Sequence, residues 1–133
     1  MHLTEKSRTW DEVIGYYKGL NESPKWDIQP MIDFVEQIVD SKYAQGLYPI
    51  TSMYTLVIGQ TPDIDPYRSV LKIEFFDGRF YFVYVDSGID THLWKRDCEP
   101  EEAFDLLNEF IHQLDWFVEY HVPVMEQSAS LSL

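Results

Sequence analysis

Residues Ser69–Asp86 have the sequence SVLKIEFFDGRFYFVYVD, in which an Asp-Gly pair separates two runs of β-branched and aromatic residues. An Asp-Gly pair favours a two-residue type I′ turn, because both central positions of that turn need a positive φ. Asp77 and Gly78 therefore predict a β-hairpin. A two-residue turn also determines which residues lie opposite each other in the two strands.

That register sorts the side chains of the hairpin onto two faces. It pairs Ile73 with Phe82, and Phe76 with Arg79. One face is wholly apolar and is predicted to be buried: Leu71, Ile73, Phe75, Phe80, Phe82 and Tyr84. The opposite face mixes charged and apolar side chains, which suits partial exposure: Val70, Lys72, Glu74, Phe76, Arg79, Tyr81, Val83 and Val85.

Further strands are predicted on both sides of the hairpin. Residues 51–59 are rich in β-branched residues, as strands are, and are predicted as one strand. Residues 60–68 contain two prolines and are predicted as a loop. Residues 91–96 are predicted as the last strand. With the hairpin, these segments indicate an antiparallel meander of three to four strands.

Two helices are predicted before the sheet. The first spans about residues 10–18, where Thr9 and Glu12 have the spacing of a capping box. Gly19 is expected to end this helix. The second spans about residues 29–44, where apolar residues recur at intervals of three and four.

A long helix is predicted after the sheet, from Pro100 to about Val118. The 133 residues are 45% hydrophobic and 16% aromatic, which fits a single domain spanning the whole chain. The predicted fold class is α+β in two layers, with the two N-terminal helices and the long C-terminal helix on the apolar face of the sheet. Residues 121–133 are expected to form a flexible tail.

The charge balance restricts the kinds of partner. There are 23 acidic and 10 basic side chains, for a net charge of -13. This balance disfavours nucleic acids and anionic membrane surfaces, since both are bound through Lys and Arg. Residues 97–133 contain nine acidic residues and no Lys or Arg. Such a one-sign field speeds association with a basic protein, although solubility alone is the competing interpretation.

Nucleophilic and nucleotide chemistry find little support in the sequence. Cys98 is the single cysteine, and the acidic residues around it disfavour the thiolate. Nothing in the sequence places His92 beside it. The sequence contains no G-x-S-x-G elbow and no glycine-rich phosphate loop. We therefore expect no enzymatic activity and no cofactor.

Metal binding is also not expected. Glu109 and His112 have the helical spacing of a di-iron motif, but that chemistry needs two such motifs and further carboxylates. Asp63 and Asp65 lie in a proline-containing loop that lacks the other ligands of a calcium loop. One cysteine and a polar N-terminus without a signal-peptide core favour the cytoplasm.

The remaining signal is an interaction surface. Tyr and Trp are frequent at the energetic centres of protein interfaces, and the chain has nine tyrosines and four tryptophans. The candidate partner-binding residues are an acidic strip on the last helix and several tyrosines and loop acids: Glu101, Glu102, Asp105, Glu109, Tyr16, Tyr17, Asp63, Asp65 and Tyr81.

The sequence thus favours a non-enzymatic acidic domain that binds a basic protein, in the manner of a bacterial immunity or antitoxin protein. Two alternatives stay open. One is an acidic chaperone of a secretion system. The other is a small ligand-binding protein or enzyme with a pocket between the sheet and the C-terminal helix.

Overall fold

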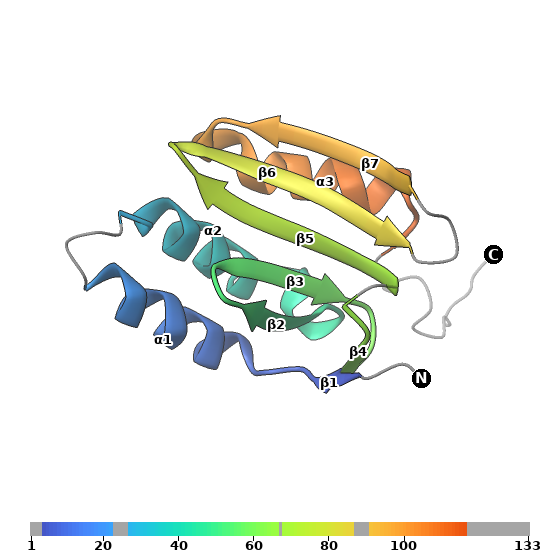
Figure 1. Ribbon diagram of the computed structural model, residues 1–133, viewed down its shortest axis with the longest axis horizontal. Helices are drawn as coiled ribbons and strands as arrows, with labels where there is room; N and C mark the ends of the chain where they lie inside the picture. Colours follow the sequence, from blue (N-terminus) through green and yellow to red (C-terminus); the bar gives the residue numbers. More distant parts are fainter. Residues whose placement is uncertain (1–3, 23–26, 67, 87–90, 117–133) are drawn as a thin grey trace.

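The computed structural model describes residues 4–22, 27–66, 68–86 and 91–116, and within them the fold is α+β (Figure 1). The helical segments are α1 (Trp10–Asn21), α2 (Gln29–Val39), the 3₁₀ turn η1 (Lys42–Gln45), the 3₁₀ turn η2 (Pro100–Glu102) and α3 (Ala103–Gln113). The strands are β1 (Glu5–Lys6), β2 (Tyr48–Ser52), β3 (Thr55–Gly59), β4 (Asp63–Ile64), β5 (Arg68–Phe76), β6 (Arg79–Asp86) and β7 (Thr91–Cys98).

The predicted hairpin is confirmed as β5 and β6. Ile73 lies opposite Phe82 and Phe76 opposite Arg79, as the two-residue turn requires. Asp77 has a φ of 53° and Gly78 a φ of 81°, so both central residues of the turn are left-handed.

The main sheet has five antiparallel strands in the order β2-β3-β5-β6-β7, so the predicted count of three to four is wrong. The segment expected as one strand over residues 51–59 is a second hairpin, in which Ser52 pairs with Thr55. Met53 takes a φ of 56° in its turn. Nothing local in the sequence marks this turn, because methionine has no preference for a left-handed backbone.

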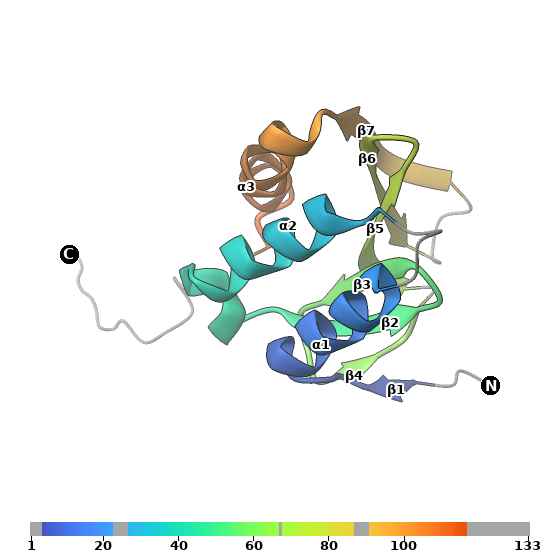
Figure 2. The same ribbon diagram turned by 90° about the vertical axis from the view of Figure 1, so that its left-hand side faces the viewer.

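The core lies against the apolar face of the β5–β6 hairpin. Five of the six residues predicted for that face are buried and Phe75 is partly buried. Phe34 of α2 contacts Phe80 with ring centroids 5.3 Å apart, and Phe110 of α3 contacts Tyr84 at 5.6 Å. Figure 2 shows α2 and α3 on the same side of β5 and β6.

The opposite face of the sheet is covered at one end by a second, smaller core. It contains Ile50, Val57, Ile64 and Val70, and Ile64 belongs to the short β1–β4 ribbon. Val70 is therefore fully buried, although the sequence pattern placed it on the mixed face.

The two N-terminal helices end differently from prediction. The capping box of α1 is confirmed, since Thr9 and Glu12 exchange hydrogen bonds. The helix continues through Gly19 to Asn21, because glycine inside a helix costs only about 0.5–1 kcal/mol. Helix α2 ends at Val39, before the predicted residue 44, and Ser41 then caps η1 through the backbone N–H of Tyr43.

Helix α3 ends at Gln113 in a Schellman motif, short of the predicted Val118, which lies outside the described residues. Asp115 has a φ of 58°, and its N–H donates to the carbonyl of His112. The N–H of Trp116 donates to the carbonyl of Ile111. The ring of Trp116 packs against Phe110 at 5.0 Å, so burial of Trp116 turns the chain back onto the helix.

Candidate partner-binding surface

The exposed large apolar side chains of the described residues gather at one end of the molecule. They are Tyr16, Met53, Tyr54 and Phe76, with 38%, 72%, 43% and 69% of their surface exposed. The β2–β3 turn and the β5–β6 turn lie at this end, together with the end of α1 and the start of α2 (Figure 1). We call it the hairpin end, and Figure 2 is a view onto it.

Two tyrosines of α1 hold the β2–β3 turn in place. The hydroxyl of Tyr16 donates to the carbonyl oxygen of Met53 at 2.6 Å, and that of Tyr17 donates to the carbonyl oxygen of Tyr54 at 3.2 Å. Tyr17 is 1% exposed, and burial, with smaller contributions from Tyr16 and Glu74, raises the pKa of its hydroxyl. Tyr16 can therefore contact a partner, whereas the side chain of Tyr17 supports the turn from inside.

A pocket of about 370 Å³ opens at the hairpin end. The pairing of β3 with β5 stops at Leu56 and Ile73, and the pocket lies beyond that point, where the two strands separate. Its lining comes from both helices, the β2–β3 turn and the end of β5: Tyr17, Leu20, Ile28, Met31, Ser52, Met53, Tyr54, Thr55, Glu74, Phe75 and Phe76. The pocket is therefore mainly apolar and aromatic, with one carboxylate.

That carboxylate belongs to Glu74. One of its oxygens accepts a hydrogen bond from the hydroxyl of Thr55 at 2.7 Å. Within the part of the chain that the structure describes, Glu74 forms no ion pair. Its negative charge is therefore available to a ligand or a partner.

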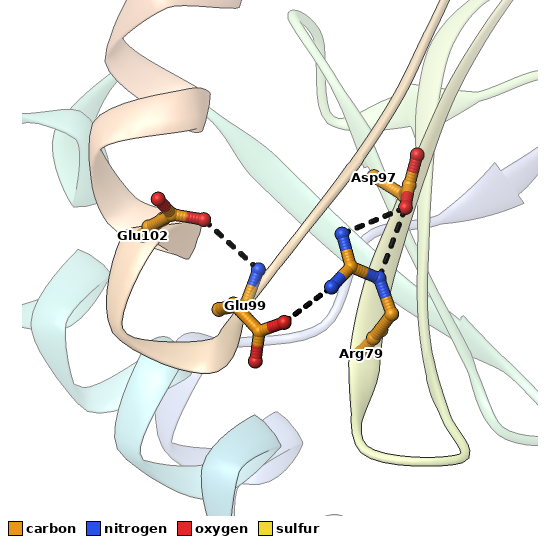
Figure 3. Close-up of polar contacts among 4 residues, drawn as sticks. All are labelled: Arg79, Asp97, Glu99 and Glu102. Atoms are coloured by element: carbon orange, nitrogen blue, oxygen red, sulfur yellow. Dashed lines mark hydrogen bonds and ion pairs between the residues drawn. The ribbon is translucent and has the colours of Figure 1, made fainter.

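The acidic end of β7 and the segment leading into α3 also lie at the hairpin end. Figure 3 shows Asp97 and Glu99 in contact with Arg79, which directly follows the β5–β6 turn. The guanidinium of Arg79 contacts Asp97 at 2.8 and 3.0 Å and also pairs with Glu99. The hydrogen bond that Arg79 donates to the Asp97 carboxylate is the main reason why the pKa of Arg79 is raised. The Glu102 carboxylate accepts from the backbone N–H of Glu99 at 3.1 Å, which caps η2.

The four acids predicted to form a strip are all exposed along η2 and α3: Glu101, Glu102, Asp105 and Glu109. None of the four forms an ion pair with a residue that the structure describes. The strip begins beside the hairpin end and runs away from it along α3 (Figure 1). Its first members can therefore border the same contact area as the exposed aromatic side chains.

The other predicted residues are divided between the two ends of the sheet. Tyr81 is half-buried on β6, opposite Glu74 on one side and Asp97 on the other, and so lies near the hairpin end. Asp63 lies in β4 with its carboxylate 3.8 Å from the ammonium group of Lys6. Asp65 follows β4, so the structure leaves these two acids near the other end of the sheet.

Sequence reasoning did not select Met53, Tyr54, Glu74 or Phe76 as site residues. The sequence pattern could have indicated Phe76 and Glu74, since both lie on the mixed face of the predicted hairpin beside its turn. No sequence pattern indicated Met53 and Tyr54, because the β2–β3 turn that exposes them was not predicted.

The structure gives Cys98 the surroundings of an unreactive thiol. Its surface is 6% exposed. Burial raises the pKa of the thiol to about 11, and the negative charge of Glu102 adds to the effect. The side chain of His92 lies outside the described residues. Among the residues described, no three His, Cys, Asp or Glu side chains are grouped so that they could hold a metal ion.

The space between the sheet and α3, where the sequence suggested a pocket, contains packed aromatic rings. Phe110 contacts both Trp94 and Trp116 with centroids 5.0 Å apart. The pocket of the hairpin end lies instead beside α1 and α2. In the described part of the chain, no helix has the length and apolar character needed to cross a membrane.

Comparison with known proteins gives no relative from which to transfer a function: no family model matches the chain, and neither a curated protein nor a solved structure shows a significant match.

Proposed function

We propose that this chain is a non-enzymatic domain that binds and neutralises a basic protein through the hairpin end. The supporting observation is that the four exposed large apolar side chains of the described residues gather there, beside acids that form no ion pair with any residue the structure describes. The expected two-layer arrangement, with all three helices on the apolar face of the sheet, belongs to this proposal because it leaves the hairpin end uncovered.

The two kinds of side chain have different physical roles in such a contact. Aromatic and methionine side chains contribute affinity when a partner buries them, and they are enriched at the centre of interfaces. Exposed carboxylates around that centre steer an oppositely charged protein and raise its association rate. Phe76 and Met53 supply the first property, and Glu101, Glu102 and Asp105 supply the second.

Affinity capture with the tagged chain tests the apolar contribution. The double variant Met53→Ser, Phe76→Ser should lose a basic protein that the wild type retains. A matched variant, Glu5→Gln, changes an exposed residue in β1 and should retain it. A captured set that is the same for wild type and double variant would contradict the proposal.

Association kinetics with the purified partner test the acidic contribution. Charge reversal at Glu102 and Asp105 to Lys should lower the association rate severalfold and change dissociation less. The wild-type rate should also fall as salt increases from low to physiological concentration. If neither salt nor the charge reversals change the association rate, the acidic strip contributes only to solubility. Glu5→Lys is the control for a charge reversal away from the hairpin end.

A ligand-binding protein is the second candidate, because small-molecule pockets are typically about 300–1,000 Å³ and mainly apolar, as the pocket of the hairpin end is. Saturable stabilisation by a small molecule, without any protein partner, would favour it. An obligate dimer that binds only unfolded segments would favour the chaperone alternative. The cytoplasmic location also belongs to this proposal, supported by the single cysteine.

A further inference from the structure

We infer that the pocket of the hairpin end receives an arginine side chain of the basic partner, an inference that rests on the proposed function. The pocket combines an apolar interior, aromatic walls and a single carboxylate. These three features correspond to the three parts of an arginine side chain: an aliphatic stem, a planar cation and hydrogen-bond donors.

The apolar lining suits the stem. Leu20, Ile28 and Met31 contribute aliphatic and thioether surface from the two N-terminal helices. The methylene groups of an arginine would lose their contact with water against this surface, while the charged head remains near the opening. Met31 is 1% exposed, so most of this accessible surface comes from the partly buried Leu20 and Ile28.

The aromatic walls suit the cation. Tyr54, Phe75 and Phe76 line the pocket at the β2–β3 turn and the end of β5. A guanidinium group is attracted to the face of an aromatic ring and is less strongly hydrated than an ammonium group. Tyr54 and Phe76 are also 43% and 69% exposed, so a partner can reach them without rearranging the core.

Glu74 supplies the counter-charge. The hydrogen bond from Thr55 holds one carboxylate oxygen, and no hydrogen bond from a residue that the structure describes occupies the other. A guanidinium can donate to that oxygen in a charge-assisted hydrogen bond. An apolar side chain of a partner would instead cover Glu74 without pairing it, which is unfavourable because a buried charge loses its hydration.

Nuclear magnetic resonance titration with small probes tests the inference without the partner. The cationic probe is N-acetyl-arginine methylamide, and the matched neutral probe is the citrulline analogue, which has nearly the same shape. The arginine probe should shift the amide signals of residues 52–55 and 74–76. It should bind about tenfold more tightly than the citrulline probe, since citrulline keeps N–H donors but lacks the positive charge that pairs with the Glu74 carboxylate.

Two variants locate the charge that discriminates the probes. Glu74→Gln should abolish the preference for arginine, while Glu5→Gln, at an exposed residue of β1 that does not line the pocket, should preserve it. Glu74 is exposed, so the Gln variant should stay folded, and the far-ultraviolet circular dichroism spectrum checks this.

Each other outcome overturns the inference in a recognisable way. Equal binding of the two probes would show an apolar pocket without charge selection. An arginine probe that shifts no amide of the hairpin end would show that the pocket is not its site. An unchanged preference in Glu74→Gln would assign recognition to other groups. None of these results decides the proposed function, because capture by the Met53→Ser, Phe76→Ser variant tests it separately.

Discussion

The hydroxyl of Tyr16 donates a hydrogen bond of 2.6 Å to the backbone carbonyl of Met53, and so ties α1 to the β2–β3 turn. The next residue of the helix, Tyr17, donates to the next carbonyl of the turn, that of Tyr54, at 3.2 Å. Two consecutive tyrosines thus hold two consecutive residues of a turn that carries exposed apolar side chains. The shape of the hairpin end therefore depends on α1.

Replacing either hydroxyl should loosen this turn. Tyr16→Phe and Tyr17→Phe should each lower the free energy of unfolding by about 0.5–1.5 kcal/mol, the usual net contribution of one hydrogen bond. Tyr81→Phe is the control, because the Tyr81 hydroxyl makes no hydrogen bond to any residue that the structure describes. Urea denaturation measures all three variants. A loss in Tyr81→Phe as large as in the other two would mean that the turn contacts are unimportant.

Gly78 at the tip of the β5–β6 hairpin should tolerate no β-branched residue. Its φ is 81°, and a left-handed conformation costs an ordinary L-residue about 1–2 kcal/mol. Gly78→Val should therefore destabilise the protein by at least that amount, as measured by thermal unfolding. A stability equal to that of the wild type would disprove the type I′ assignment.

Replacing Gly15 should increase stability, in contrast to the loss expected at Gly78. It lies inside α1, and apart from its chain neighbours and the backbone of its own helix, a Cβ atom built there meets no atom within 4 Å. Gly15→Ala should stabilise the protein by about 0.5–1 kcal/mol, because alanine loses less backbone entropy in a helix. The same unfolding measurement compares it with Gly78→Val, and a destabilised Gly15→Ala variant would show that the site is not open.

Phe110 should be among the most sensitive core positions. It is fully buried, and its ring contacts Tyr84, Trp94 and Trp116. Phe110→Ala should cost about 3–5 kcal/mol, since it removes apolar contact and leaves a cavity. Phe76→Ala makes the same change at an exposed position and should stay within about 0.5 kcal/mol of the wild type. Similar losses in the two variants would contradict the burial pattern.

The Cys98 thiol should lose its proton at a higher pH than an ordinary cysteine. Its folded-state pKa of about 11 lies above the ordinary value for cysteine, about 8.5. Alkylation of the folded protein by iodoacetamide should therefore accelerate with pH up to about pH 11, rather than level off near pH 9.

The same pKa shift predicts the direction of a stability change. Below the unfolded-state pKa, the thiol is protonated in both states and its contribution to stability is fully present. As pH rises from about 8.5 to about 11, the unfolded state loses its proton first, so folding stability falls. Cys98→Ser should lack this part of the pH dependence. Identical pH profiles for the two proteins would contradict the raised pKa.

The β5–β6 hairpin and the helix starting at Trp10 could be predicted from the sequence, because neighbouring residues carry their signals. Asp77 and Gly78 favour a left-handed turn by their own backbone preferences, and the period of two then determines the buried face. Thr9 and Glu12 cap α1 with groups three residues apart. The exposure of Glu101, Glu102 and Asp105 also followed from the apolar stripe of their helix.

Tertiary contacts alone decided the β2–β3 turn, the end of α3 and the composition of the hairpin end. Met53 adopts a positive φ that methionine does not favour, and Asp115 adopts one that aspartate tolerates but that does not by itself specify where a helix ends. The tyrosines of α1 hold the first turn, and the buried ring of Trp116 accompanies the second. Phe76, Met53 and Glu74 share one surface only because strand order places two separate hairpin turns at the same end of the sheet. Contacts of this kind join residues far apart in the chain, so no local pattern of side chains can encode them.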